Sequence, residues 1–284
     1  MTTEEGLCKS CNTPFNNSRT LCDVCQSDIG FPNVRAAIKN QKLLDDRFKL
    51  VMASINSRQL EVTANNYKNA VNDASVVIAR SMTSLLPMID NSNVLLSTFH
   101  HQVASNARLA ENNEFDPKRE AVESLLHPFY YKDVHYAALS LDSVGIKYYG
   151  DVHIQFKDNL IKHRTSFFEE NPFNFVKKHK IIVGENIPGG YSATWEEKWK
   201  LALCKSHANL TSDLKSNDDF KNILVVECEK NPDFIEAHIF GTIHVACINK
   251  VTMFSDADKT SMLLFNANKS KFSTLNIDTE VRGM

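Results

Sequence analysis

Residues 234 to 241 read Phe234-Ile-Glu-Ala-His-Ile-Phe-Gly241, a stretch with the composition of a β-strand that two titratable side chains interrupt. In a strand, residues two apart point to the same face of the sheet, so Glu236 and His238 share a face. A carboxylate and an imidazole between two phenylalanines have two explanations. Either the segment is a solvated edge strand, or this face lines a cleft in which Glu236 does chemistry.

Length and composition describe an ordinary globular protein of 284 residues, with 43% hydrophobic residues and a formal net charge of −2. The near-neutral charge gives no whole-chain signal for nucleic acid. No apolar run is long enough to cross a membrane, and the acidic, polar N-terminus does not resemble a signal peptide. Four of the seven cysteines form two close pairs, which is typical of metal binding in a reducing compartment. We therefore expect a cytoplasmic protein.

Two C-x2-C pairs near the N-terminus predict a metal site. Cys8 and Cys11 form the first pair, and Cys22 and Cys25 form the second. Each pair presents two thiolates to one ion from a single turn, and two such pairs complete the tetrahedral site that Zn²⁺ prefers. An Fe–S cluster is the alternative occupant of the same ligands. We expect a zinc ribbon over residues 1–30, in which the metal is structural.

The middle of the chain is predicted to be helical over residues 31–128. It belongs to a longer stretch, 31–144, that contains no glycine, and its apolar residues recur at the three- and four-residue steps of a helix face. His100 and His101 have no partner at ligand spacing, so we interpret them as surface or core histidines. The expected helices cover residues 44–55, 60–85, 94–110 and 116–126.

After Pro128 the composition changes to aromatic and β-branched residues punctuated by glycine, which predicts strands. Thr194, with Glu197 three residues later, is expected to cap a helix over residues 195–210. Glu169-Glu170 is interpreted as a solvated turn. Residues 129–284 are thus predicted to form an α+β domain with a predominantly antiparallel sheet. The expected strands cover residues 134–141, 149–156, 223–227, 234–241 and 243–253.

Three segments of this half resemble an ADP-ribosyltransferase-type domain of bacterial and phage proteins. They are Tyr149-Gly150-Asp151-Val152, Arg164-Thr165-Ser166-Phe167 and the stretch 234–241. Together with the cysteine pairs, they more closely resemble a bacterial family of unassigned proteins that joins an N-terminal zinc ribbon to this domain. The resemblance covers about residues 130 to 255. It implies a mono-ADP-ribosyltransferase that uses NAD⁺ as its substrate.

The resemblance also implies roles for particular residues. In that superfamily an early strand carries Arg or His, a second strand carries a Ser/Thr-rich motif, and a late strand carries the catalytic Glu. By this order Glu236 is the catalytic residue. His238 departs from the common Glu-x-Glu acceptor motif, and we expect it to orient or deprotonate the acceptor. The implied NAD⁺-binding residues are His135, Tyr149, Arg164, Thr165 and Ser166.

The residue types suit this chemistry. Cleavage of the N-glycosidic bond of NAD⁺ develops positive charge on the nicotinamide ribose, which a nearby carboxylate stabilises. A Ser or Thr hydroxyl can hold the ribose and the carboxylate, and an Arg or His can clamp the diphosphate. The sequence contains neither a Gly-x-Gly-x-x-Gly motif nor a P-loop, so it does not support a Rossmann dinucleotide site or an NTPase.

Several functions remain open from the sequence. The first is ADP-ribosyl transfer to a protein or nucleic acid, as a toxin or phage-defence effector with an antitoxin or regulatory partner. The second is a nucleic-acid- or protein-binding zinc ribbon joined to a non-catalytic α+β domain, with Thr165-Ser166 an ordinary strand-edge pair. NAD⁺ hydrolysis without transfer would use the same site. A metallohydrolase built on His135, His153 and His238 is disfavoured, because these residues lack paired-ligand spacing.

Overall fold

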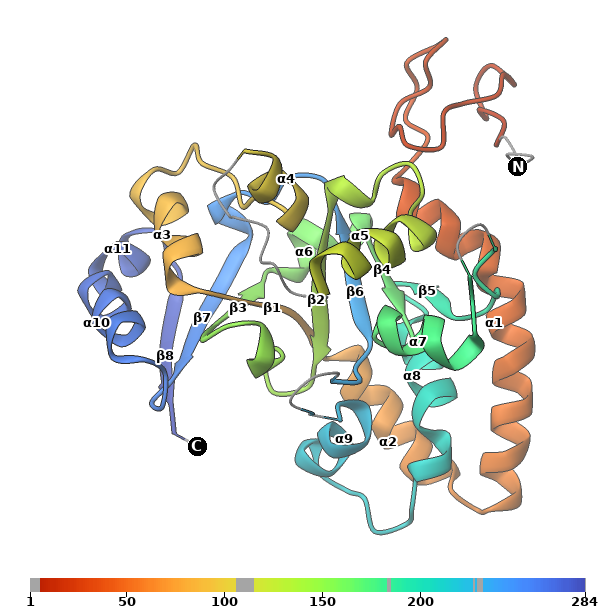
Figure 1. The fold of residues 1–284 in the computed structure, drawn as a ribbon. Helices are drawn as coiled ribbons and strands as arrows, with labels where there is room; N and C mark the ends of the chain where they lie inside the picture. Colours follow the sequence, from red (N-terminus) through yellow and green to blue (C-terminus); the bar gives the residue numbers. More distant parts are fainter. Residues whose placement is uncertain (1–5, 106–114, 183–184, 227, 229–231, 284) are drawn as a thin grey trace.

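The computed structural model describes residues 6–105, 115–182, 185–226, 228 and 232–283. Over these residues one mixed sheet of eight strands runs through the molecule in the order β5-β4-β6-β2-β1-β3-β7-β8, with helices around it (Figure 1). Neighbouring strands are antiparallel except β7 and β8, which are parallel. The predicted α+β class is confirmed. The strands are β1 (Ser75–Arg80), β2 (Val134–Ser140), β3 (Val152–Phe156), β4 (Thr165–Phe168), β5 (Ser192–Thr194), β6 (Glu236–Phe240), β7 (Ile248–Phe254) and β8 (Asp278–Arg282).

The long helix α1 lies alongside β5 and β4, and α10 and α11 lie near the β8 end of the sheet (Figure 1). The α-helices are α1 (Pro32–Ser57), α2 (Glu61–Asn72), α3 (Met82–Asp90), α4 (Phe99–Ala104), α5 (Phe115–Leu126), α6 (Asp158–Ile161), α7 (Pro172–His179), α8 (Lys198–Ser206), α9 (Asn217–Leu224), α10 (Lys259–Ala267) and α11 (Lys269–Thr274). Short 3-10 turns are η1 (Tyr131–Asp133), η2 (Lys147–Tyr149), η3 (Lys162–Arg164), η4 (His207–Asn209) and η5 (Val245–Cys247). None of the described helices combines the length and apolarity needed to span a bilayer.

The expected helix over residues 60–85 is wrong in its second half. Helix α2 ends at Asn72, and residues 75–80 form β1, which pairs with β2 and β3 in the middle of the sheet. A strand that is buried on both faces is apolar throughout, so it lacks the alternation that distinguishes a strand from a helix. The adjacent Val76, Val77 and Ile78 are the β-branched residues that favour the strand.

Other boundaries also differ from the expected ones. The expected strands over residues 149–156 and 243–253 begin later, as β3 at Val152 and β7 at Ile248. Thr194 lies in β5 opposite Ser166 and does not cap a helix; α8 begins only at Lys198. The predicted strand over residues 223–227 is partly the end of α9, because the local capping box at Ser216 starts a helix there. The expected helix over residues 94–110 is confirmed only as α4, and residues 106–110 lie outside the described part of the chain.

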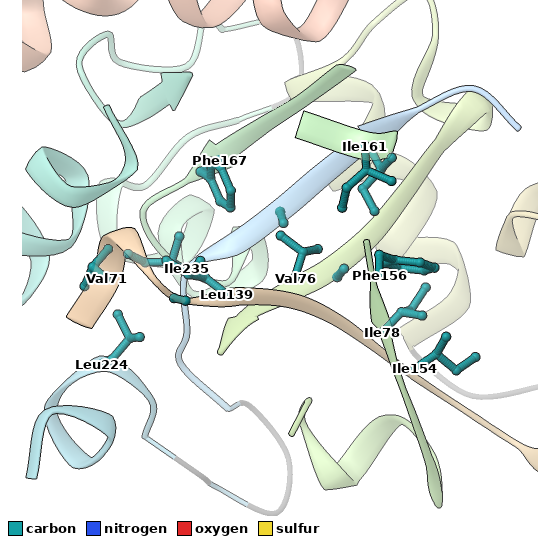
Figure 2. Packing of buried hydrophobic residues seen from close by; sticks show 14 of the residues in the cluster. Val71, Val76, Ile78, Leu139, Ile154, Phe156, Ile161, Phe167, Leu224 and Ile235 are labelled. Carbon is teal, nitrogen blue, oxygen red and sulfur yellow. The ribbon is translucent and has the colours of Figure 1, made fainter. Parts of the chain in front are cut away.

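The two faces of the sheet differ in chemistry. Figure 2 shows one face, where side chains such as Phe167, Leu139 and Ile154 pack together with Val71 and Leu224 from α2 and α9. Glu236 and His238 point to the opposite face, because the apolar residues of β6 alternate with them. The apolar core therefore lies on one side of the sheet, and the titratable side chains of β6 lie on the other.

Helix α1 is joined to the sheet by a buried ion pair. The guanidinium of Arg47 binds both carboxylate oxygens of Glu169 at 2.6 and 2.9 Å and stacks on the ring of Tyr191 at 3.8 Å. Glu169 and Glu170 are 4% and 6% exposed, so the expectation of a solvated turn is wrong. Glu170 is also paired, with Lys178. The sequence could not indicate this burial, because Arg47 lies 122 residues away.

We predict that Arg47→Leu lowers the free energy of unfolding by about 3 kcal/mol, because it leaves the buried Glu169 carboxylate without its cation. Urea denaturation followed by circular dichroism measures this change. The double variant Arg47→Leu/Glu169→Leu should be closer to wild type than the single variant, since it removes both charges. A double variant as unstable as the single one would contradict the prediction.

Candidate functional site

The N-terminal segment folds as two similar turns, residues 7–13 and 21–27. Each begins Leu-Cys-x-x-Cys and ends in an amide and a hydroxyl residue. In both turns the first cysteine N–H donates to a carbonyl five residues later, and its own carbonyl accepts from the N–H four residues later. Asn12 and Gln26 occupy equivalent positions with φ of 57° and 58°. This left-handed conformation closes each turn and directs its two thiols toward the other turn.

The four cysteines converge, as predicted, into a cluster that can hold a metal ion. Their sulfur atoms all lie within 4.8 Å of one another, with Cys8 and Cys25 at 3.6 Å and Cys11 and Cys22 at 3.6 Å. Four thiolates about 2.3 Å from one Zn²⁺ would stand about 3.8 Å apart, so the arrangement fits a tetrahedral ion.

Two hydroxyl groups lie against these sulfurs. Thr13 Oγ1 is 2.7 Å from Cys11 Sγ, and Ser27 Oγ is 3.2 Å from Cys8 Sγ and 3.0 Å from Cys25 Sγ. The Ser27 hydroxyl is the largest cause that lowers the pKa of Cys8 to about 5. These hydroxyls therefore favour the thiolate form that a metal ion requires.

One arginine of α1 contacts this segment, residues 6–30, which we call the cysteine ribbon. Arg35 of α1 stacks on the ring of Phe15, with the guanidinium carbon 4.8 Å from the ring centroid. The same guanidinium donates to four backbone carbonyls of the ribbon, those of Asn17, Arg19, Ile29 and Gly30.

A buried chain of hydrogen bonds surrounds the residues singled out on β6. His238 Nε2 lies 2.9 Å from Glu236 Oε1, and His238 Nδ1 lies 2.9 Å from His127 Nε2. His127 Nδ1 lies in turn 3.1 Å from the hydroxyl of Tyr130. The side chain of Glu236 is 12% exposed and that of His238 is 2% exposed, so the carboxylate lies nearer the surface than the imidazole.

One hydrogen bond in this chain has a direction that an ionised carboxylate sets, since a carboxylate only accepts. Burial lowers the pKa of His127 well below its usual range, and the neighbouring His238 lowers it further. An ionised Glu236 accepts from His238 Nε2–H. A neutral His127 carries one ring proton, either on Nε2 toward His238 or on Nδ1 toward Tyr130. Burial raises the pKa of Glu236, and the hydrogen bond from His238 offsets part of that shift.

A second polar group lies above the same face of the sheet on α5. Arg119 Nε donates to Glu123 Oε1 at 2.6 Å, and Glu123 Oε2 is 2.6 Å from His100 Nε2. The Arg119 guanidinium also lies 5.9 Å from the ring centroid of Tyr136, which stands opposite His238 on β2. The charge of Glu236 contributes to raising the pKa of Tyr136 well above its usual range, after burial and Glu123. Helix α5 thus places a cation and a second carboxylate within electrostatic range of Glu236.

The structure brings Ser166 and Tyr149 into this neighbourhood. Ser166 of β4 is directly opposite His238, so both side chains point to the same face. The Tyr149 ring packs edge-on against Phe234, and its side chain is half-exposed. Burial raises the pKa of the Tyr149 hydroxyl, with the charge of Glu236 as the next cause.

Three other predicted binding residues lie elsewhere. His135 and Thr165 both stand opposite Ile239, on the face away from Glu236, and the Thr165 hydroxyl donates to the Ile161 carbonyl. Arg164 donates to the carbonyls of Phe240 and Thr242, so it holds the chain where β6 ends. The structure does not bring these three side chains together with the carboxylate.

His135 is a buried histidine with one unused ring nitrogen. It is 1% exposed, and its Nδ1 has no hydrogen-bond partner among the described residues. Burial, with Arg80 and Arg164 nearby, lowers its pKa to about 3. His153 is similar, since burial lowers its pKa to about 4 while its Nδ1 accepts from the Gly145 N–H. Both histidines are therefore neutral at physiological pH.

Sequence reasoning missed His127, Arg119 and Glu123. They come from the region predicted to be helical, residues 31–128, in which no site residue was assigned, and they lie on or directly after α5. The sequence contained one signal that could have been used: Arg119 and Glu123 are four residues apart in a predicted helix, so they make an i,i+4 ion pair. Nothing local indicated that His127 would contact a residue 111 positions later.

Comparisons with known proteins do not assign this site, since neither the protein-family models nor the curated proteins gave a match to the chain.

We predict that the purified protein binds one Zn²⁺ per chain and that Cys22→Ser removes it, because a tetrahedral thiolate site needs all four ligands. Metal analysis by mass spectrometry measures the stoichiometry. Cys228→Ser, an exposed cysteine outside the cluster, is the matched control and should keep the metal. The core contains no residue of the cysteine ribbon, so the far-ultraviolet circular dichroism of Cys22→Ser should stay close to wild type. Loss of zinc in both variants would contradict this site.

We predict that the protein loses stability in acid between pH 6.5 and about pH 4, because its buried histidines stay neutral. An unfolded histidine has a pKa of about 6.5, so below that pH the unfolded chain binds a proton that the folded His153 does not. The free energy of unfolding should fall by up to about 1.4 kcal/mol per pH unit for each such histidine. Urea titrations at several pH values give the free energy of unfolding against pH, and this plot should be less steep for His153→Gln than for wild type. An equally steep plot would rule out a neutral buried His153.

Proposed function

We propose that this protein is a mono-ADP-ribosyltransferase that transfers ADP-ribose from NAD⁺ to a macromolecular acceptor, with Glu236 as its catalytic carboxylate. The observation that carries the proposal is the buried hydrogen bond from His238 to Glu236, on a strand whose sequence resembles the late catalytic strand of that superfamily. A charge this close to the core is costly to bury. Its presence with a dedicated chain of histidines behind it favours a chemical role over a structural one.

The proposed reaction breaks the bond between the nicotinamide nitrogen and C1′ of the ribose. Nicotinamide leaves with the bonding electrons, and C1′ develops positive charge. An ionised Glu236 stabilises that charge electrostatically and accepts a hydrogen bond from the ribose. The acceptor nucleophile then bonds to C1′ with its own electron pair and releases its proton to solvent water.

The neighbouring residues have supporting roles in this proposal. His238, by donating to one carboxylate oxygen, keeps Glu236 ionised and leaves its other oxygen for the substrate. The half-exposed ring of Tyr149 offers a surface on which the nicotinamide can stack. The hydroxyl of Ser166 points to the same face, where it is buried and accepts from Asn33 Nδ2, so it supports β4 behind the carboxylate; the side chains of His135 and Thr165 point to the other face.

The cysteine ribbon contributes a structural Zn²⁺ to this proposal. Its thiolates need a reducing compartment, so we propose a cytoplasmic enzyme. An intracellular transferase of this kind suits a toxin or phage-defence effector, whose activity an antitoxin or regulatory protein would control. The acceptor is a protein or a nucleic acid.

We predict that Glu236→Gln reduces ADP-ribosyl transfer by at least about 100-fold, because the amide cannot supply the charge that stabilises the transition state. The substitution should not destabilise the fold above pH 7, since it removes a buried carboxyl whose pKa is raised. Transfer of label from radioactive NAD⁺ to a cell lysate measures activity, and thermal unfolding measures stability.

The matched control is Glu120→Gln, whose carboxylate lies on α5 and accepts from the exposed Tyr131 hydroxyl. It should leave transfer unchanged. Digestion of the labelled lysate with nuclease or protease identifies the acceptor class. Free ADP-ribose without labelled macromolecule would indicate NAD⁺ hydrolysis, and labelling by Glu236→Gln at the wild-type rate would overturn the assignment of Glu236.

The alternative function is a protein-binding module with a non-catalytic α+β domain. Three apolar side chains of the cysteine ribbon, Leu7, Leu21 and Val24, are 54%, 47% and 67% exposed, which favours a protein partner over nucleic acid. This alternative requires that the wild-type protein neither consumes NAD⁺ nor transfers label. Binding of a partner should then weaken when Leu21 is replaced by Asp.

A further inference from the structure

One asparagine at the start of α1 connects the two strands that carry the candidate site. Asn33 is 1% exposed, and its Nδ2 lies 2.8 Å from the carbonyl oxygen of His238. The same Nδ2 lies 3.0 Å from the carbonyl oxygen of Arg164 and 3.2 Å from Ser166 Oγ. The Asn33 side chain thus contacts β6 at His238, the residue before β4 at Arg164, and β4 itself at Ser166. These partners lie 131 to 205 residues away in the sequence.

The chemistry of this contact defines the orientation of the carboxamide. Two of the three neighbours are carbonyl oxygens, which can only accept, so the amide nitrogen must face them. The other end, Asn33 Oδ1, has no hydrogen-bond donor among the described residues. The side chain therefore acts as a donor to β4 and β6, and its removal would leave the buried His238 carbonyl with one partner fewer.

Residues next to Asn33 pack the first turn of α1 against the end of β6. The ring of Phe31 is 6.1 Å from that of Phe240, and Phe240 is 5.8 Å from Tyr130, the first member of the hydrogen-bond chain to Glu236. Two residues after Asn33, Arg35 holds the cysteine ribbon. The first turn of α1 is thus where the ribbon, β4, β6 and the histidine chain meet.

We infer that Asn33 is a positioning residue for the Glu236–His238 pair. By holding the His238 backbone against β4, it sets where the imidazole of His238 lies between Glu236 and His127. A backbone shift at His238 would disturb the two 2.9 Å contacts of its ring, because a ring held on both sides cannot move without changing the distance or angle to at least one partner. The consequence for NAD⁺ turnover rests on the proposed function, whereas the consequence for His238 does not.

The test compares Asn33→Ala with Asn40→Ala. Asn40 lies on the same helix and bonds the Ala36 carbonyl and the Gly190 N–H, away from β6, so it controls for the loss of a helical asparagine. Long-range proton–nitrogen spectra of the histidine rings report the tautomer of His238, with His238→Gln for assignment. We expect Asn33→Ala to alter the His238 signals and to lower kcat by about 10- to 100-fold with little change in KM. Asn40→Ala should change neither.

A third variant, Asn33→Gln, keeps the amide donor and should retain part of the wild-type His238 spectrum. It replaces Asn33→Ala in the comparison if that variant does not fold. Unchanged His238 signals and kcat in a folded Asn33→Ala would overturn the inference and leave the proposed function standing. If the wild-type protein shows no NAD⁺ turnover, the proposed function fails, and the His238 spectra alone decide the role of Asn33.

Discussion

The hydrogen bond between His238 and Glu236 is the interaction on which the polar face of this protein depends. A carboxylate next to the core must be hydrogen-bonded, because an uncompensated buried charge costs several kcal/mol. His238 meets that need, but a buried imidazole also needs partners of its own. His127 supplies one, and Tyr130 supplies the next, so one buried charge extends into a chain of four side chains.

The sheet accommodates this chain by separating its two faces. One face is apolar and packs with α2, α8 and α9, which gives the molecule its core. The opposite face is covered by α5, whose Arg119 and Glu123 add a second charged pair near Glu236. A strand such as β6 can serve both faces, because successive side chains point in opposite directions. Ala237 and Ile239 belong to the core, and Glu236 and His238 belong to the site.

The N-terminal part of the chain is connected to this site through the first turn of α1. Arg35 binds carbonyls of the cysteine ribbon, and Asn33 binds the carbonyls of His238 on β6 and of Arg164 directly before β4. Such a small ribbon has little apolar surface of its own, and the hydrogen bonds of Arg35 to its carbonyls fix it to α1. The helix then passes along the sheet edge, where Arg47 and Glu169 hold it.

The sequence by itself determined the features whose cause is local. The spacing of Cys8, Cys11, Cys22 and Cys25 predicted the cysteine cluster, since each tight turn presents two thiols. Alternation along residues 234–241 put Glu236 and His238 on one face. Only the tertiary structure decided that β1 is a strand, that Glu169 is buried, and that His127, Arg119 and Asn33 reach the site. Each of these depends on a partner far away in sequence, and a pattern of neighbouring residues carries no information about which distant group will supply the hydrogen bond or the charge.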